Sequence, residues 1–245
     1  MRKVYCISGL GADHHIFDGL DVPGVHWAHL SWLMPEGDET LEAYAGRMSA
    51  GIDEASHRPA PAGDATGAPG AGLPAETSPV LLGVSFGGMM AIEIAKLLPA
   101  ATVILISSIR HRRQLPLPIK MTAYLGLGKW TPPANLRLLA PIQDYFLGVE
   151  TEADSRLVRE YRGNVDPHYL QWAIRQIASW QNEWQPGVFY HIHGSKDHIF
   201  PLNRVEPTHL VKGGGHLMIH NRAGEISKIL MEILGDLALG GQLFV

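Results

Sequence analysis

Ser85 is the residue of this chain whose surroundings are best suited to chemistry. It lies in residues 83–88 (Gly-Val-Ser-Phe-Gly-Gly), between the apolar run 79–82 and a second apolar run, 89–98. This pattern predicts a strand, a sharp turn and a helix, with the serine at the turn. The flanking glycines let strand and helix approach closely, and the helix amides can stabilise negative charge beside the hydroxyl. The segment therefore indicates a nucleophile, provided that the chain supplies a base and an acid.

An aspartate and a histidine later in the sequence offer those two groups. A serine hydroxyl needs a base to remove its proton, and histidine suits because its ordinary pKa is about 6.5. Asp197 follows a predicted strand that ends near Ile192, and His216 follows three glycines after a strand that ends near Val211. Loops at the carboxyl ends of parallel strands gather in one crevice, so we expect Ser85, Asp197 and His216 to meet. The order Ser, Asp, His is also the order typical of such a site.

The elements that must position these residues alternate along the chain. Helices are predicted at 40–55, with Asp38 or Thr40 as N-cap, at 89–98 and at 222–237. Strands are predicted at 4–7, 27–32, 80–82, 102–106, 188–192 and 205–211. This alternation predicts an α/β fold, with a mainly parallel sheet of about six strands covered by helices on both faces.

Two segments interrupt the alternation. Residues 57–79 are rich in Pro, Gly, Ala and Thr, which predicts a flexible loop without core-forming capacity. Residues 109–184 have early prolines and later helical segments, at 151–161 and 167–181, which predicts a helical cap. The predicted α/β core is then 1–108 and 185–245.

Taken together, four segments of the chain resemble the α/β-hydrolase superfamily, in the manner of a small carboxylesterase-like serine hydrolase with a helical cap. They are 8–11 (Ser-Gly-Leu-Gly), 83–88, 194–201 and 213–216. The resemblance covers nearly the full length and implies that Ser85 is the nucleophile, His216 the general base and then acid, and Asp197 the orienting acid. It also implies an oxyanion hole formed by the backbone amides of Phe86 and Leu10.

The first of these segments departs from the family pattern, because members usually carry histidine where this chain has Ser8. Since Leu10 contributes a main-chain amide, the oxyanion hole does not require that histidine. We expect the substitution to change the hydrogen bonds that support the loop.

Other histidines and carboxylates compete for functional roles. His191, His193 and the pair 197–198 are similar to the H-x-H-x-D-H pattern of binuclear metallohydrolases, but three residues instead of one separate His193 from Asp197. This spacing favours buried or satisfied histidines over metal ligands. His14 and His15 either rim the pocket or are solvated, and we favour solvation. The triple glycine before His216 favours it over His220 as the base, and Asp144 and Asp154 are expected to be solvated cap carboxylates.

Charged and aromatic side chains near the predicted cap have two interpretations each. Residues 110–113 (Arg-His-Arg-Arg) either bind a substrate carboxylate or phosphate or form a solvated charged turn, and the second is favoured. The cap aromatics either line an acyl pocket or pack the cap itself, which is favoured: Tyr124, Trp130, Tyr145, Phe146, Trp172 and Trp180. Met89 and Met90 are expected in the core.

Composition narrows the class of protein further. The 245 residues are 46% hydrophobic, and a net charge of −4 gives no overall attraction to nucleic acid or anionic membranes. Cys6 cannot form an internal disulfide and is expected to be a small core residue. No apolar run reaches the length of a signal-peptide core or a membrane span, so we expect a cytoplasmic protein without membrane insertion.

The resulting expectation is a serine hydrolase that cleaves a small or medium, partly apolar carboxylic ester through an acyl-enzyme, with no metal or organic cofactor. Thioester, amide or carbon–carbon hydrolysis and acyl transfer use the same triad and stay open, as does a slow-turnover ligand-binding homologue. The serine at the turn argues against the dehalogenases and epoxide hydrolases of this fold, which use aspartate there. The expected partner is a small acyl substrate, and the oligomeric state is open.

Overall fold

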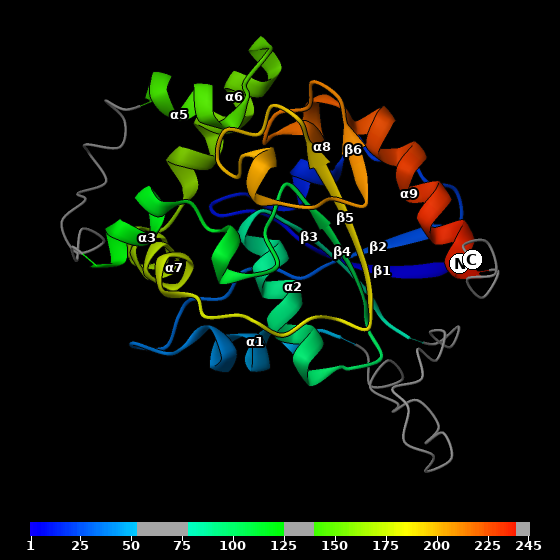
Figure 1. Cartoon of the computed structure of the whole chain (residues 1–245), viewed down its shortest axis with the longest axis horizontal. Coiled ribbons are helices and arrows are strands. Elements are labelled where there is room, and N and C mark those ends of the chain that lie inside the picture. Colours follow the sequence, from blue (N-terminus) through cyan, green and yellow to red (C-terminus); the bar gives the residue numbers. More distant parts are fainter. Residues whose placement is uncertain (53–77, 125–139, 239–245) are drawn as a thin grey trace.

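A six-stranded parallel sheet forms the centre of the computed structural model, which describes residues 1–52, 78–124 and 140–238 (Figure 1). The strand order is β2-β1-β3-β4-β5-β6, and every neighbouring pair is parallel. The strands are β1 (Arg2–Ile7), β2 (Val25–His29), β3 (Val80–Val84), β4 (Thr102–Ile106), β5 (Val188–Gly194) and β6 (His209–Val211). The predicted parallel sheet of about six strands is confirmed.

Alternating strand residues pack into two separate hydrophobic layers, one on each face of the sheet. Leu81, Val103 and Leu105 face the layer that contains α1 (Leu41–Ser49) and α2 (Phe86–Leu97). Their sequence neighbours face the opposite layer, which contains η1 (His14–Phe17), α8 (Met218–Asn221) and α9 (Ala223–Ala238). A strand buried on both faces must be apolar throughout, which explains the unbroken apolar runs of β3 and β4.

Three elements are shorter than their sequence patterns predict. β2 ends at His29 instead of residue 32, because its partner β1 ends at Ile7. β6 begins only at His209, since Pro207 has no N–H to offer a neighbouring strand. The helix predicted to reach residue 55 ends at Ser49, just before Gly51, and its N-cap is Thr40 and not Asp38.

The segment between β4 and β5 contains the remaining helices. They are η3 (Arg112–Gln114), α3 (Leu117–Tyr124), α5 (Ala140–Leu147), α6 (Glu152–Asn164) and α7 (Pro167–Ser179), and η5 (Leu202–Arg204) follows β5. The segment meets the loops at the carboxyl ends of the strands: Leu217 N donates to Leu147 O at 2.8 Å, and Val165 lies against Gly11. The division into a core and a cap stays a prediction, and the predicted loop at 57–79 falls outside the described residues except for 78 and 79.

No helix among the described residues combines the length and apolar character that a membrane crossing requires. Cys6 lies buried in β1, and burial raises the pKa of its thiol. Met89 and Met90 are fully buried in α2, as expected.

Candidate active site

The turn between β3 and α2 holds Ser85 in a backbone conformation that side-chain-bearing residues rarely adopt, with φ 53° and ψ −119°. Such a conformation costs about 1–3 kcal/mol and persists only where its surroundings enforce it. Here the close backbone packing that the neighbouring glycines permit holds Ser85 in this conformation. A Cβ at Gly83 would lie 2.3 Å from the Gly87 carbonyl oxygen, and one at Gly87 would lie 2.3 Å from that of Ile7. The glycines therefore let β3, α2 and the end of β1 close around the serine.

Hydrogen bonds on both sides fix the Ser85 backbone. Its N–H donates to Ile106 O at 3.0 Å, and its carbonyl accepts from the Ser108 hydroxyl at 2.6 Å and from Gly88 N at 3.0 Å. Ser108, which the sequence did not single out, thus ties the turn to the end of β4. A serine two residues after a strand is too common a pattern to have revealed this.

The structure brings Ser85, His216 and Asp197 into one hydrogen-bonded chain. His216 Nε2 lies 2.9 Å from Ser85 Oγ, and His216 Nδ1 lies 2.8 Å from Asp197 Oδ2. His216 is 5% exposed and Asp197 2%, so both are shielded from water. A Cβ at Gly194 would lie 2.2 Å from Gly214 O, so glycine is needed where the two loops that carry the acid and the histidine meet.

Asp197 has partners for both of its carboxylate oxygens. Oδ2 faces His216, and Oδ1 accepts from the backbone N–H groups of Ile199 at 2.9 Å and Phe200 at 2.8 Å. Burial opposes ionisation of the carboxyl group, but the positive charge available at His216 and these hydrogen bonds outweigh it and lower the pKa of Asp197. The acid is therefore held as a carboxylate that can orient His216.

His193 supports the acid from behind. Its Nε2 lies 2.8 Å from Phe200 O and 3.7 Å from Asp197 Oδ2, and its side chain is completely buried. Burial lowers the pKa of His193, so the neutral ring donates from Nε2 to Phe200 O and holds the loop that carries the acid. The sequence predicted a buried or satisfied His193 but not this contact, because the loop returns to the strand only in three dimensions.

The loop after β1 lies against the serine, as the oxyanion-hole prediction requires. A Cβ at Gly9 would be 3.5 Å from Ser85 Cβ, and neither Leu10 N nor Phe86 N donates to a backbone carbonyl in the described part of the chain. Ser8 supports the loop: its hydroxyl donates to Ala12 O at 2.7 Å and accepts from Trp32 Nε1 at 3.0 Å. In this way Ser8 replaces the expected histidine with a hydrogen bond across the loop.

The competing base and acids are engaged elsewhere. His220 Nε2 lies 3.6 Å from Asp154 Oδ1, while Asp144 pairs with Arg162. The expectation that Asp154 is solvated is wrong, because it is 1% exposed and accepts from the N–H groups of Glu150 and Thr151 at the start of α6. A carboxylate at a helix N-terminus satisfies free amides, which explains its burial.

The remaining histidines separate into buried and exposed groups. His191 is fully buried with its ring 5.0 Å from that of His193, but neither of its nitrogens has a hydrogen-bond partner among the described residues. It is therefore buried, as predicted, yet not satisfied. His14 and His15 are exposed, as favoured, but His14 also lines the pocket described below; with Asp13 they form a group of potential metal ligands.

The basic and aromatic residues near the predicted cap differ from one another in how far they are buried. The segment 110–113 is only partly solvated: Arg113 is exposed, whereas the Arg110 side chain is 17% exposed and pairs with Glu206 at 3.0 Å, and His111 is buried. Trp172 and Trp180 are buried and Trp172 stacks on Tyr44, whereas Tyr145 and Phe146 are exposed. The side chains of Tyr124 and Trp130 lie outside the described residues.

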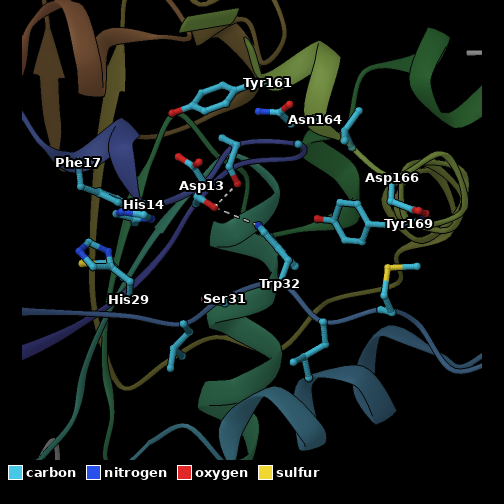
Figure 2. A pocket seen from close by; sticks show the side chains of 18 residues that line it. Asp13, His14, Phe17, His29, Ser31, Trp32, Tyr161, Asn164, Asp166 and Tyr169 are labelled. Carbon is cyan, nitrogen blue, oxygen red and sulfur yellow. Dashed lines mark hydrogen bonds between the residues drawn. The ribbon is translucent and has the colours of Figure 1, made fainter.

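A pocket of about 330 Å³ lies beside the serine loop, between the ends of β1 and β2 and the helices α6 and α7 (Figure 2). Ser8, Gly11 and Trp32 line it, and Trp32 also stacks on Phe86 with ring centroids 5.0 Å apart. Ser85 itself does not line the pocket, and the loop 8–12 and Trp32 connect the pocket with the serine turn. No sequence signal predicted it, because its lining comes from segments far apart in the chain.

Comparison with known proteins places this geometry in a known fold. No family model and no curated protein matches the sequence. Among solved structures, a thermophilic esterase is 18% identical over 97% of this chain and 91% of its own, with a TM-score of 0.66. An esterase from Exiguobacterium antarcticum is 14% identical (96% and 92%; TM-score 0.68), and a putative lipase from Acinetobacter baumannii 13% (97% and 84%; 0.64). These similarities show that the chain has the α/β-hydrolase fold.

Proposed function

We propose that this protein is a serine hydrolase that cleaves carboxylic esters through an acyl-enzyme intermediate. The proposal rests on the continuous hydrogen-bonded chain from Asp197 through His216 to the hydroxyl of Ser85. Ser85 lies at a turn with a positive φ of 53°, beside the loop after β1. The esterases and lipase with the same fold support ester hydrolysis as the class of reaction.

In the first half of the proposed reaction, Asp197 keeps a proton on Nδ1 of His216, which leaves Nε2 free to accept. As Ser85 Oγ attacks the acyl carbon, its proton passes to Nε2, and the carbonyl oxygen becomes an oxyanion that faces the amides of Phe86 and Leu10. The C–O bond to the alcohol then breaks, and His216 returns the proton to the leaving oxygen.

In the second half, water takes the place of the alcohol. His216 accepts a proton from water as the hydroxide attacks the acyl carbon, and the same amides face the second oxyanion. The bond to Ser85 Oγ breaks, the proton returns to the serine, and the acid product leaves. Every proton transfer uses His216, so a metal ion or organic cofactor is not part of the proposal.

The proposed substrate is a small or medium, partly apolar ester. Thioesters, amides and acyl acceptors other than water use the same groups, and the choice among them depends on the leaving-group surroundings.

A fluorophosphonate probe tests the proposed nucleophile. We expect wild-type protein to be labelled at Ser85 and Ser85→Ala to be unlabelled, with its melting temperature measured to show that it is folded. Untreated wild type from the same preparation is then assayed against esters and matched thioesters of graded acyl length. Absence of labelling in the folded wild type would contradict the proposal, and a preference for thioesters would replace the ester assignment.

A further inference from the structure

The pocket beside the loop 8–12 has a buried polar group that the protein itself does not satisfy. Tyr169 of α7 lines the pocket and is 5% exposed, and its hydroxyl has no hydrogen-bond partner among the described residues. In Figure 2 this hydroxyl points from α7 toward Trp32, into the space between α7 and the loop. A buried hydroxyl without a partner costs about 1–3 kcal/mol, so its retention suits a donor that a ligand completes.

Tyr161 of α6 also lines the pocket with a hydroxyl that is unpartnered among the described residues, whereas a tyrosine outside the pocket provides a contrast. The Tyr44 ring lies against Trp32 and Trp172, yet its hydroxyl donates to Leu33 O at 2.8 Å and accepts from Leu33 N at 2.6 Å. Two buried tyrosines thus lie in the same aromatic cluster, and only the one that faces the pocket is unpartnered. Burial keeps the Tyr169 hydroxyl protonated by raising its pKa well above the ordinary value, so it is available as a donor.

Tyr169 lies between an aromatic wall and the polar side chains of Asn164 and Asp166 (Figure 2). The Trp32 and Tyr169 rings lie 5.6 Å apart, and Leu33 and Val165 complete that end of the pocket. At about 330 Å³ the pocket is near the lower limit for ligand sites, which suits a single small ring and not a long chain.

Charge restricts the ligand further. The lining includes the carboxylates of Asp13 and Asp166, and none of the described lining residues is Lys or Arg. His29, at the opposite end from Tyr169, has a pKa lowered by burial and by His14, so it is neutral at pH 7. Asp13 is paired with His15 at 2.9 Å, so an anionic ligand would meet one such paired carboxylate, the carboxylate of Asp166, and no Lys or Arg side chain of the described lining.

We propose that this pocket binds an uncharged planar ring that carries an oxygen acceptor, with the ring against Trp32 and the oxygen accepting a hydrogen bond from the Tyr169 hydroxyl. The ring has two sources: the remote part of the ester substrate, which rests on the proposed function, or a separate small molecule that contacts the outer side of the loop 8–12. The recognition chemistry is the same in both.

Matched probes test the oxygen contact directly. Acetophenone and α-methylstyrene have the same shape and differ only in an oxygen in place of a CH₂ group. We expect wild-type protein to bind acetophenone about three- to tenfold more tightly, the contribution of one neutral hydrogen bond. Affinities are measured by ligand-observed NMR titration.

The variant Tyr169→Phe removes only the hydroxyl. It should bind both probes equally and melt at the same or a higher temperature, because an unpartnered buried group is lost. Tyr44→Phe is the matched control and should lose stability while it keeps the preference for acetophenone. Equal binding of both probes by the wild type, or an unchanged preference in Tyr169→Phe, would overturn the proposal.

A second variant tests the charge argument independently of Tyr169. Benzoate should bind the wild type at least tenfold more weakly than acetophenone at pH 7.5, and Asp13→Asn should narrow that gap, since asparagine keeps the N-cap of η1 but not its charge. Benzoate binding as tight as acetophenone binding in the wild type would contradict the assignment.

Inhibition kinetics distinguish the two sources of the ring. If the pocket holds part of the substrate, acetophenone raises KM for an aryl-bearing ester and leaves kcat unchanged. If the ligand is a separate molecule, acetophenone changes kcat for ethyl butyrate, which has no ring. Fluorophosphonate labelling of Ser85 is measured on separate aliquots of the same protein. Failure of the proposed function is then seen separately from failure of the pocket to bind the probes.

Discussion

The proposed triad of Ser85, His216 and Asp197 and the adjoining pocket satisfy their buried polar groups in opposite ways. Around the triad, each Asp197 oxygen and each His216 nitrogen has a partner, and the Ser85 carbonyl has two. In the adjoining pocket, the Tyr169 hydroxyl has no hydrogen-bond partner among the described residues. The two regions share Ser8 and Trp32, which face the pocket and support the loop beside the serine.

The difference indicates that the two regions interact with a ligand in different ways. Groups that transfer protons must be positioned in advance, because reorganisation during the reaction would raise the barrier. A group that selects a ligand gains discrimination when its polar atom is satisfied only by the correct occupant. We therefore expect substitutions around the triad to cost stability and activity together, and substitutions in the pocket to separate the two.

The largest expected effect is that of Gly87→Ala. The added Cβ would lie 2.3 Å from Ile7 O and 2.4 Å from Ser8 O, both backbone atoms that cannot move without shifting β1. We expect a loss of about 3 kcal/mol or more in the free energy of unfolding, together with loss of ester turnover. Urea denaturation and an ester assay measure the two quantities.

Gly163→Ala is the matched control on the side of α6. Nothing lies within 4 Å of a Cβ built at this helical glycine, so alanine should stabilise the protein by about 0.5–1 kcal/mol and leave the activity unchanged. If Gly87→Ala and Gly163→Ala had the same stability and activity, close packing around Ser85 would not be what positions it.

An intermediate effect is expected for Ser8→Ala. The change leaves Trp32 Nε1 and Ala12 O without their partner, which should cost about 1–3 kcal/mol in stability. Because the loop also carries Leu10, we expect kcat for an ester to fall by up to about 10², the contribution of one oxyanion donor. Ser8→Thr keeps the hydroxyl and should recover most of kcat. Wild-type kinetics in Ser8→Ala would show that the loop is positioned without this hydrogen bond.

The smallest effect on turnover is expected for a residue that controls how stability depends on pH. Burial lowers the pKa of His191 to about 3, with His193 and Arg110 adding to the shift. Since the unfolded histidine binds a proton near pH 6.5, the neutral buried ring stabilises the fold fully above that pH. That contribution is lost as pH falls toward 3, by at most about 1.4 kcal/mol per pH unit.

His191→Phe should therefore flatten the fall in stability between pH 6.5 and 4 without changing ester turnover at pH 8. The exposed His26 gives the control variant His26→Phe, which should leave the slope unchanged. If the free energy of unfolding fell equally steeply with decreasing pH in His191→Phe and in the wild type, His191 would be excluded as the cause of that fall.

The sequence predicted that Ser85, Asp197 and His216 lie together because each follows a strong local signal. Apolar strands and glycine turns precede Ser85 and His216, and parallel strands must bring their carboxyl ends together. The limits of β2 and β6 were missed because they depend on where the neighbouring strand ends or on one proline, and not on the strand's own pattern.

The pocket was not predictable in the same way. Tyr169 lies in an amphipathic helix pattern in which a buried tyrosine is indistinguishable from any other core aromatic. Its missing hydrogen bond depends on how α7 packs against a loop about 160 residues earlier in the chain. The support of Asp197 by His193 was missed for the same reason, since the contact with Phe200 O arises from the return of a loop.

Trapping of the acyl-enzyme tests the central claim most directly. Wild-type protein is mixed with 4-nitrophenyl acetate, quenched in acid within milliseconds and analysed by peptide mass spectrometry, with Ser85→Ala as the control. We expect a burst of nitrophenol and one acetyl group on Ser85 that disappears as turnover is completed. A burst with the acetyl group on another residue, or ester turnover that persists in Ser85→Ala, would contradict that claim.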